Sequence, residues 1–256
     1  MLTVAINGLS GRVGQELVKV IDAHSQLYQL TEFQSRSIND GGERQFDLAL
    51  VSSENTQVVV DFSAPDLCEQ VLNTCIKNNL PLVIGTTGFD SVQLQQIEAA
   101  ARQIPVLLSP NMSLSVNVLF KVCQMVAARL SKAEVEITES HHRYKKDAPS
   151  GTAIRLGEAI AAGRGHDFEK VACYNRYGKH NATRSPEEIG FSVIRGGDIV
   201  GRHSVEFIYD GEILNLTSEI TNRGSFASGA LQAAEFLAKQ PAGFYTMEDV
   251  LGLRDI

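Results

Sequence analysis

The first half of the chain alternates short, wholly apolar segments with stretches whose apolar side chains recur at helical spacing. Strands are expected at 4–6, 27–33, 58–62, 82–84 and 106–108, and helices at 12–23, 64–78 and 90–102. Asp90 and Gln93 fit a capping box at the start of the last helix. Strands that are apolar throughout and separated by helices predict a parallel sheet covered on both faces. With right-handed crossovers, this is a doubly wound α/β domain of the Rossmann type.

The pattern changes after a long helix expected at 115–130. The segment 134–140 alternates polar and apolar side chains, and 191–194, 203–209 and 213–220 have the pattern of longer, antiparallel strands. Asp210 and Gly211 form a favourable hairpin turn between the last two of these strands. A closing helix is expected at 226–239. The second half therefore predicts a mostly antiparallel sheet with helices packed on it, an α+β domain.

Charge and cysteine content exclude several classes of protein. The chain has 256 residues, and 23 Lys and Arg against 30 Asp and Glu give a net charge of −7, which disfavours binding to nucleic acid or an anionic membrane. The start of the chain lacks the features of a signal peptide, and the longest uncharged stretch, 103–120, is interrupted by Pro110 and several polar residues. The four cysteines form neither a disulfide scaffold nor a metal-binding motif. We therefore expect a soluble, cytoplasmic protein.

A glycine-rich loop, residues 8–14, lies between the first expected strand and the first helix. Glycines let the backbone approach a pyrophosphate closely, and the start of the helix supplies N–H donors and a positive dipole. The spacing GxxGxxG differs from the usual GxGxxG, and the alternative is a plain strand-to-helix turn. Its position at the start of a βαβ unit favours dinucleotide binding.

The residues that follow the second expected strand, 34–36, predict which dinucleotide is bound. Ser35 stands where an acidic residue would bind a free ribose 2′-hydroxyl, and Arg36 beside it suits a 2′-phosphate. NADPH is therefore the expected cofactor, with NADH as the second choice. The alternative for Arg36 is a solvated surface charge. Two further loops, 85–89 and 109–112, follow parallel strands, where ligands bind in open α/β sheets, and the first is expected to contact the nicotinamide rather than only to form a turn.

The densest chemical signal lies in 139–153, because five of the six residues from His141 to Lys146 are basic or can become so. A charge run is usually a solvated face. Here it leads into a Ser-Gly-Thr start of a helix at 153–162, whose N–H groups and dipole suit a carboxylate. The combination predicts a small polyanionic substrate. No metal site is expected, since His141 and His142 are adjacent and neighbouring strand residues point to opposite sides.

The segment 141–153, HHRYKKDAPSGTA, resembles the dihydrodipicolinate reductase family of lysine and diaminopimelate biosynthesis. The resemblance covers essentially the whole chain, including the glycine loop, 60–63, 83–89, 195–201 and 249–251. It implies a dinucleotide-binding domain built from 1–112 and 222–256. It also implies an inserted domain, 113–221, that binds substrate and builds a homotetramer.

The resemblance further implies the reaction and the residues that carry it. An NAD(P)H hydride adds to an unsaturated cyclic imine dicarboxylate, formed from the hydroxylated tetrahydro substrate by water loss, and yields tetrahydrodipicolinate. His141 would be the proton donor and acceptor and Lys145 a proton donor, while His142, Gly151, Thr152 and Thr87 would bind the substrate. The residues implied to contact the cofactor, besides Ser35 and Arg36, are Gly8, Leu9, Ser10, Gly11, Arg12, Val13, Gly85, Thr86, Thr87, Ser109, Pro110, Asn111 and Met112.

The sequence departs from the family pattern at three places. Ser35 replaces an acidic residue that many members carry, Val13 replaces a common Met, and the segment 37–57 is short for a linker between two strands. Two other functions remain as hypotheses: a non-catalytic nicotinamide-binding sensor and an amino-acid dehydrogenase of similar architecture. The presence of His141 and Lys145 argues against the first, and the Ser-Gly-Thr-Ala block argues against the second.

Overall fold

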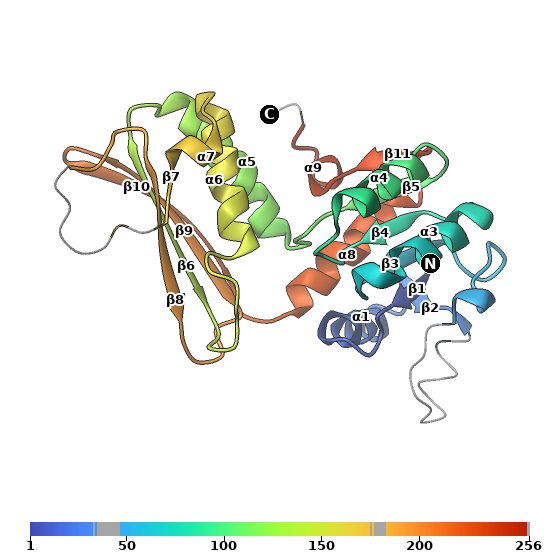
Figure 1. Cartoon of the computed structure of the whole chain (residues 1–256). Coiled ribbons are helices and arrows are strands. Elements are labelled where there is room, and N and C mark those ends of the chain that lie inside the picture. The colour runs from blue at the N-terminus through green and yellow to red at the C-terminus, as the bar shows by residue number, and fades with distance from the viewer. Residues whose placement is uncertain (33, 35–46, 175, 177–182, 255–256) are drawn as a thin grey trace. The chain divides into compact units, whose positions relative to one another are not determined.

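The computed structural model describes residues 1–32, 34, 47–174, 176 and 183–254 (Figure 1). The chain divides into two compact units, one formed by Met1–Leu114 with Arg223–Ile256 and the other by Ser115–Asn222. Ser35 and Arg36, and residues 37–46 of the short segment 37–57, lie outside the described residues.

The first unit contains a six-stranded sheet of order β11-β5-β4-β3-β1-β2, in which every pair of neighbouring strands is parallel. Its strands are β1 (Leu2–Asn7), β2 (Tyr28–Leu30), β3 (Val58–Asp61), β4 (Leu82–Ile84), β5 (Pro105–Leu108) and β11 (Gly243–Tyr245). Its helices are α1 (Arg12–Ala23), α3 (Cys68–Lys77), α4 (Ser91–Ala100), α8 (Gly224–Leu237) and α9 (Met247–Val250), with 3₁₀ turns η1 (Leu48–Leu50) and η2 (Pro65–Leu67). The expected Rossmann-type parallel sheet is confirmed.

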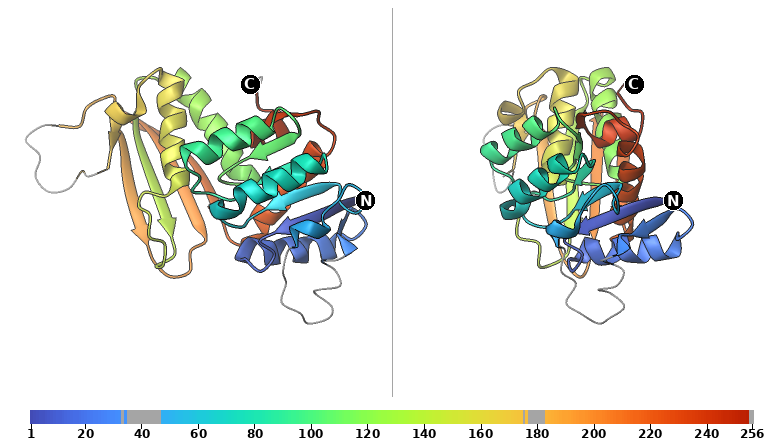
Figure 2. Two further views of the ribbon diagram at one scale, coloured as in Figure 1. Left: turned by 45° about the vertical axis from the view of Figure 1, so that its right-hand side comes forward. Right: turned by 90° about the vertical axis from the view of Figure 1, so that its right-hand side faces the viewer.

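Alternating side chains of the strands build two separate hydrophobic cores, one on each face of this sheet (Figure 2). Val58 and Val60 pack on one face against α1 and α8, whereas Val59 between them packs on the other face with α3 and α4. Both faces are covered, which is why β4 and the first three residues of β3 are apolar at every position. The carboxyl ends of these parallel strands lie along one edge of the sheet, and the loops that follow them carry the candidate cofactor residues.

Three elements of the first unit differ from the sequence expectation. The second strand is shorter, and the helix expected at 64–78 begins as the 3₁₀ turn η2, with Pro65 as its first residue. Strand β11 follows the closing helix and pairs in parallel with β5. Its three residues carry no alternation of their own, so the pairing with β5 makes them a strand. The predicted capping box of Asp90 and Gln93 is confirmed.

The second unit contains a five-stranded sheet of order β10-β9-β6-β8-β7. Its strands are β6 (Glu134–His141), β7 (Ala172–Cys173), β8 (Ile189–Arg195), β9 (Gly201–Tyr209) and β10 (Glu212–Ile220). Helices α5 (Leu114–Arg129) and α6 (Gly151–Arg164) lie together on one side of the sheet, with the short α7 (Phe168–Val171) after α6 (Figures 1 and 2). The close approach of the two long helices depends on Gly163, where a Cβ would lie 2.3 Å from the carbonyl oxygen of Gln124.

The second sheet is mixed, which corrects the expectation of a mostly antiparallel one. Strands β10, β9 and β6 are antiparallel neighbours, and Gly211 has a φ of +87° in the predicted hairpin turn between β9 and β10. Strand β8, however, runs parallel to both β6 and β7. The chain passes from β6 through α6 before it returns to the sheet, and such a helical crossover brings the next strand back in the same direction. In the part of the chain that the structure describes, no helix is both long and apolar enough to span a bilayer.

Candidate active site

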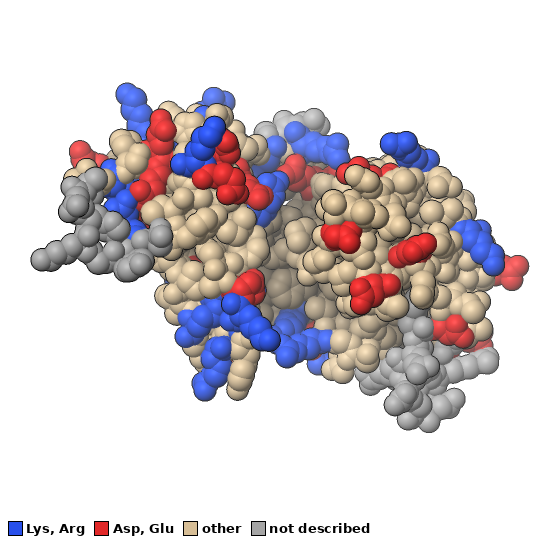
Figure 3. Space-filling view, viewed as in Figure 1, with Lys and Arg blue, Asp and Glu red and all other residues tan. Residues whose placement is uncertain are grey.

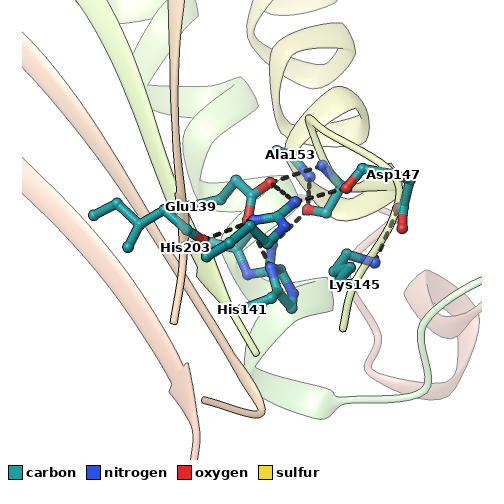
Figure 4. A network of polar contacts seen from close by, with 9 residues as sticks. Glu139, His141, Lys145, Asp147, Ala153 and His203 are labelled. Atoms are coloured by element: carbon teal, nitrogen blue, oxygen red, sulfur yellow. Dashed lines mark hydrogen bonds and ion pairs between the residues drawn. The ribbon is translucent and has the colours of Figure 1, made fainter. Parts of the chain in front are cut away.

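The carboxylate of Glu139 is the centre of a buried polar network at the end of β6 (Figure 4). The residue is 1% exposed, and each of its oxygens accepts two hydrogen bonds. Oε2 lies 2.6 Å from His141 Nδ1 and 2.8 Å from an Arg195 nitrogen, while Oε1 accepts from the Ser150 amide at 2.9 Å and from Arg195 at 2.7 Å. One side chain thus joins β6, β8 and the start of α6.

The charge of Glu139 decides where the proton of His141 lies. Burial alone would raise the pKa of Glu139, but the hydrogen bonds from His141, Arg195 and the Ser150 amide outweigh it and lower the pKa to about 2. The carboxylate is therefore ionised and can only accept hydrogen bonds, so Nδ1 of His141 is the donor. The other ring nitrogen, Nε2, is left to exchange a proton. It faces Gly201, where a Cβ would lie 3.1 Å away.

His203 is a second buried histidine, on β9 beside the first. Its ring centroid lies 5.1 Å from that of His141 in an edge-on arrangement, and its Nε2 lies 3.0 Å from Ser150 Oγ. Burial and the neighbouring positive charges lower the pKa of His203 to about 4, so the ring is neutral at pH 7. Ser150 Oγ also accepts from the Ala153 amide and caps α6. His203 therefore supports the start of that helix.

The start of α6 has the properties of an anion site. Gly151 is its exposed first residue, and a Cβ there would meet no described atom within 4 Å. The 14-residue helix directs the positive end of its dipole toward this point. Lys145 lies in the preceding loop, with its ammonium 2.9 Å from Asp147 Oδ2. In Figure 3, Lys and Arg gather at the end of this unit where the loop 142–150 lies.

The structure therefore brings together five predicted residues in the second unit. They share one end of its sheet and the adjoining helix start, and they are His141, His142, Lys145, Gly151 and Thr152. Thr87, the remaining predicted substrate residue, belongs to the first unit, where it is exposed after β4. Its contact with substrate stays a prediction.

The glycine loop of the first unit has the close packing expected of a dinucleotide cradle. Gly8 has a φ of +86°, and a Cβ there would lie 2.3 Å from the Phe62 carbonyl oxygen. A Cβ on Gly14 would lie 2.2 Å from the Gly8 carbonyl oxygen. Gly11 is the N-cap of α1 and, having no side chain, leaves the first N–H groups of the helix without a side-chain cap. This arrangement fits a pyrophosphate.

The other candidate cofactor residues lie where parallel strands end, and a buried carboxylate connects their loops. Asp61, at the end of β3, accepts hydrogen bonds from Asn7 Nδ2 at 2.7 Å, Ser63 Oγ at 2.6 Å and Thr86 Oγ1 at 2.6 Å. Burial raises the pKa of Asp61, and these three hydrogen bonds oppose that rise. The loops after β1, β3 and β4 are thereby held in one geometry.

The remaining loop, after β5, is held by its own side chain and by the core. Ser109 Oγ donates to the Asn111 carbonyl oxygen at 2.8 Å, and Pro110 is exposed. The side chain of Met112 is 1% exposed and belongs to the core formed with α1 and α8. For Met112, contact with a cofactor through the side chain therefore finds no support in the structure.

Sequence reasoning assigned no role to Glu139, Arg195, His203 and Asp61, although they organise both candidate sites. A signal for Glu139 was present, because residues two apart in a strand share a face and His141 follows it at that spacing. Arg195 and His203 come from strands far along the chain, so only the sheet order brings them to β6.

Two family models match nearly the whole chain. The model described as "Dihydrodipicolinate reductase, N-terminus" matches residues 2–112, and "Dihydrodipicolinate reductase, C-terminus" matches residues 115–251. The chain belongs to the dihydrodipicolinate reductase family.

Curated relatives and solved structures agree with membership of this family. The chain is 41% identical over 264 residues to the 4-hydroxy-tetrahydrodipicolinate reductase of Thiobacillus denitrificans, covering 98% of each chain. It is also 41% identical over 270 residues to the enzyme of that name from Syntrophotalea carbinolica, covering 99% of this chain and 100% of the relative. A dipicolinate-bound dihydrodipicolinate reductase from Paenisporosarcina is similar with a TM-score of 0.72 at 25% identity, over 96% of this chain and 97% of that one.

Proposed function

We propose that this protein catalyses the NAD(P)H-dependent reduction of the cyclic imine dicarboxylate that forms from 4-hydroxy-tetrahydrodipicolinate by loss of water. The product is tetrahydrodipicolinate, an intermediate of lysine and diaminopimelate biosynthesis. The observation that carries the proposal is the segment 141–153, in which His141 and Lys145 precede the exposed first residue of α6, in a chain of this family. With this loop complete, no observation favours a non-catalytic sensor.

The first unit is proposed to hold the cofactor. The backbone of the glycine loop and the start of α1 would bind the pyrophosphate, and the loops at 85–87 and 109–112 would contact the nicotinamide. A bound reduced nicotinamide supplies the hydride. The residues proposed to contact the cofactor are Gly8, Leu9, Ser10, Gly11, Arg12, Val13, Gly85, Thr86, Thr87, Ser109, Pro110, Asn111 and, through its backbone alone, Met112.

The second unit is proposed to bind the substrate. The amides of Gly151 and Thr152 would hold one carboxylate at the positive end of α6, and His142 would hold the other. Thr87 is proposed as a further substrate-binding residue. Two carboxylates need separate binding groups. The surrounding cations also lower the cost of bringing a doubly negative ring out of water.

Protons are proposed to pass through His141 and Lys145. Addition of a hydride to a conjugated imine builds electron density that a proton must neutralise. Nε2 of His141 can donate and accept that proton because Nδ1 is held by Glu139. The Lys145 ammonium, which the structure pairs with Asp147, would be a second donor and would stabilise developing negative charge.

NADPH is proposed as the preferred cofactor over NADH. The support is the Ser35-Arg36 pair, in which the cation suits a 2′-phosphate and no acidic group binds a free hydroxyl. Arg36→Ala should reduce the ratio of kcat/KM for NADPH to that for NADH. An unchanged ratio would remove Arg36 from cofactor selection.

The second unit is also proposed to build a homotetramer. The face of its sheet turned away from α5 and α6 exposes Ile194 and Ile213, which are 50% and 62% exposed. Light scattering of the purified protein measures the assembly directly, and a monomeric mass would contradict it. A cytoplasmic location is supported by the free, buried thiols of Cys68, Cys75 and Cys123, which need no oxidising compartment.

The activity is tested by feeding freshly prepared hydroxy-tetrahydrodipicolinate to the purified protein and following loss of reduced nicotinamide. Substrate-dependent oxidation is expected, and its absence with both cofactors would overturn the proposed function. Lys145→Ala should lower kcat at least about a hundredfold if it delivers a proton. Lys146→Ala, which removes the neighbouring exposed ammonium, is the matched control and should remain near the normal rate.

A further inference from the structure

We propose that Glu139 is a positioning residue that fixes the ring of His141 and the start of α6 to a single carboxylate. The group that exchanges the proton and the group that binds the substrate would then keep one relative geometry. The proposal rests on the proposed function and deepens it, because it assigns the residue through which the two parts of that site act together.

Glu139 holds the ring of His141 through one of its oxygens. Glu139 and His141 are two apart on β6, so their side chains share one face of the sheet, and Oε2 lies 2.6 Å from Nδ1. An ionised carboxylate accepts only, so this contact places the proton on Nδ1 and leaves Nε2 for exchange. Without the carboxylate, the neutral ring is free to place its proton on either nitrogen and to rotate.

Glu139 also holds the start of α6, the helix proposed to bind the substrate. The other oxygen, Oε1, accepts from the backbone N–H of Ser150 at 2.9 Å. Ser150 is the N-cap of α6, and Gly151 and Thr152, whose amides form the candidate carboxylate site, follow it directly. The start of α6 is therefore joined to β6, eleven residues earlier in the chain, through Glu139.

Arg195 holds the carboxylate of Glu139 itself. Arg195 on β8 donates to both oxygens, at 2.7 and 2.8 Å, and also to the Asp147 carbonyl oxygen at 2.6 Å. Donors thus approach both oxygens of Glu139 from His141, Ser150 and Arg195. A glutamine would turn an NH₂ group toward one pair of these donors, so an isosteric amide cannot satisfy the arrangement.

The titratable groups around His141 come from four parts of the second unit. They are Glu139 on β6, Arg195 on β8, His203 on β9 and Lys145 in the following loop. Glu139 is the one carboxylate in this group, so it is the group that can accept the Nδ1 proton. If Glu139 contributed to stability alone, its ion pair with Arg195 would be sufficient. Its contacts with His141 and Ser150 would then have no effect on turnover.

The test compares Glu139→Gln with Glu136→Gln in the full-length protein. Glu136 is also a β6 carboxylate paired with an arginine, since its Oε1 accepts from Arg184 Nε at 3.0 Å, but it has no place in the proposed site. Both variants are assayed for kcat and KM with the imine substrate. Long-range proton–nitrogen NMR of histidine-labelled protein then identifies which ring nitrogen of neutral His141 carries hydrogen, with His141→Asn used to assign the signal.

The expected result is an Nδ1–H ring in the wild type and in Glu136→Gln, and loss of that preference in Glu139→Gln. The kcat of Glu139→Gln should fall at least about tenfold, with a higher KM, while Glu136→Gln stays within about twofold of wild type. A kcat of Glu139→Gln within about threefold of wild type overturns the proposal.

The remaining outcomes also support or overturn the role proposed for Glu139. If Glu139→Gln does not fold, the wild-type spectrum is sufficient, because an Nε2–H ring in neutral His141 overturns the proposal and an Nδ1–H ring supports it. If the wild type folds but is inactive with either cofactor, the proposed function fails. The tautomer comparison then still shows whether Glu139 fixes His141.

Discussion

Replacement of His203 by glutamine tests whether a neutral, buried histidine supports the start of α6. His203 is 2% exposed, and its Nε2 lies 3.0 Å from the Ser150 hydroxyl. The amide nitrogen of glutamine can occupy a similar position and keep this hydrogen bond, but it cannot take up a proton near neutral pH. The two proteins should therefore differ in the pH dependence of stability.

The magnitude follows from the pKa of His203, which burial lowers from 6.5 to about 4 in the folded state. Between these values the unfolded chain binds a proton that the folded chain does not, so acidification favours unfolding. At pH 5 the loss of stability relative to pH 7.5 is about 2 kcal/mol, which corresponds to a factor of about 30 in the opening equilibrium.

Glu139 does not interfere in this range. Its pKa is lowered from 4.5 to about 2, so the stability that it contributes is present above pH 4.5 and is lost as the pH falls through the folded value.

Amide hydrogen exchange of peptides from β9 gives the measurement, because it reports opening of the second unit separately from the first. After correction for the intrinsic exchange rate, wild-type β9 should open about 30-fold more readily at pH 5 than at pH 7.5. This increase should be absent in His203→Gln. His24→Gln, at an exposed position just after α1, is the control and should behave as the wild type. Equal pH ratios for His203→Gln and wild type would refute a neutral His203.

Three further replacements test the two candidate sites. Gly14→Ala places a Cβ 2.2 Å from the Gly8 carbonyl oxygen, so titration with reduced nucleotide should show at least about tenfold weaker binding; unchanged affinity would contradict the cradle. Asp61→Asn turns an NH₂ group toward the hydroxyl donors Ser63 and Thr86, and it should weaken nucleotide binding by about 1–2 kcal/mol in the same titration. Wild-type affinity would show that the loops after β1, β3 and β4 keep their geometry without the carboxylate. In Gly151→Ala the added Cβ meets no described atom within 4 Å, so the variant should fold with unchanged or higher stability. Its methyl group should nevertheless raise the KM for substrate several-fold. A normal KM would exclude close approach of a carboxylate to this position.

Most elements of the first unit could be predicted because their signals are local. Helix α1 was predicted at its observed bounds from the spacing of its apolar residues, and β4 from three consecutive apolar side chains. The capping box of α4 is likewise formed by two residues only three apart. Strand β11 has no such local signal, since it is defined by its pairing with β5 more than a hundred residues earlier.

The amino-acid sequence by itself determined the features that depend on near neighbours: the helix and strand periods, the glycine turn after β1, and the run of cations that leads into α6. Tertiary structure decided which strands lie side by side, and hence that β8 is parallel to β6. It also decided that Arg195 and His203 meet Glu139 and His141. The physical reason is that sheet order depends on the crossover through α6 and on contacts between residues more than fifty positions apart, which no local pattern encodes.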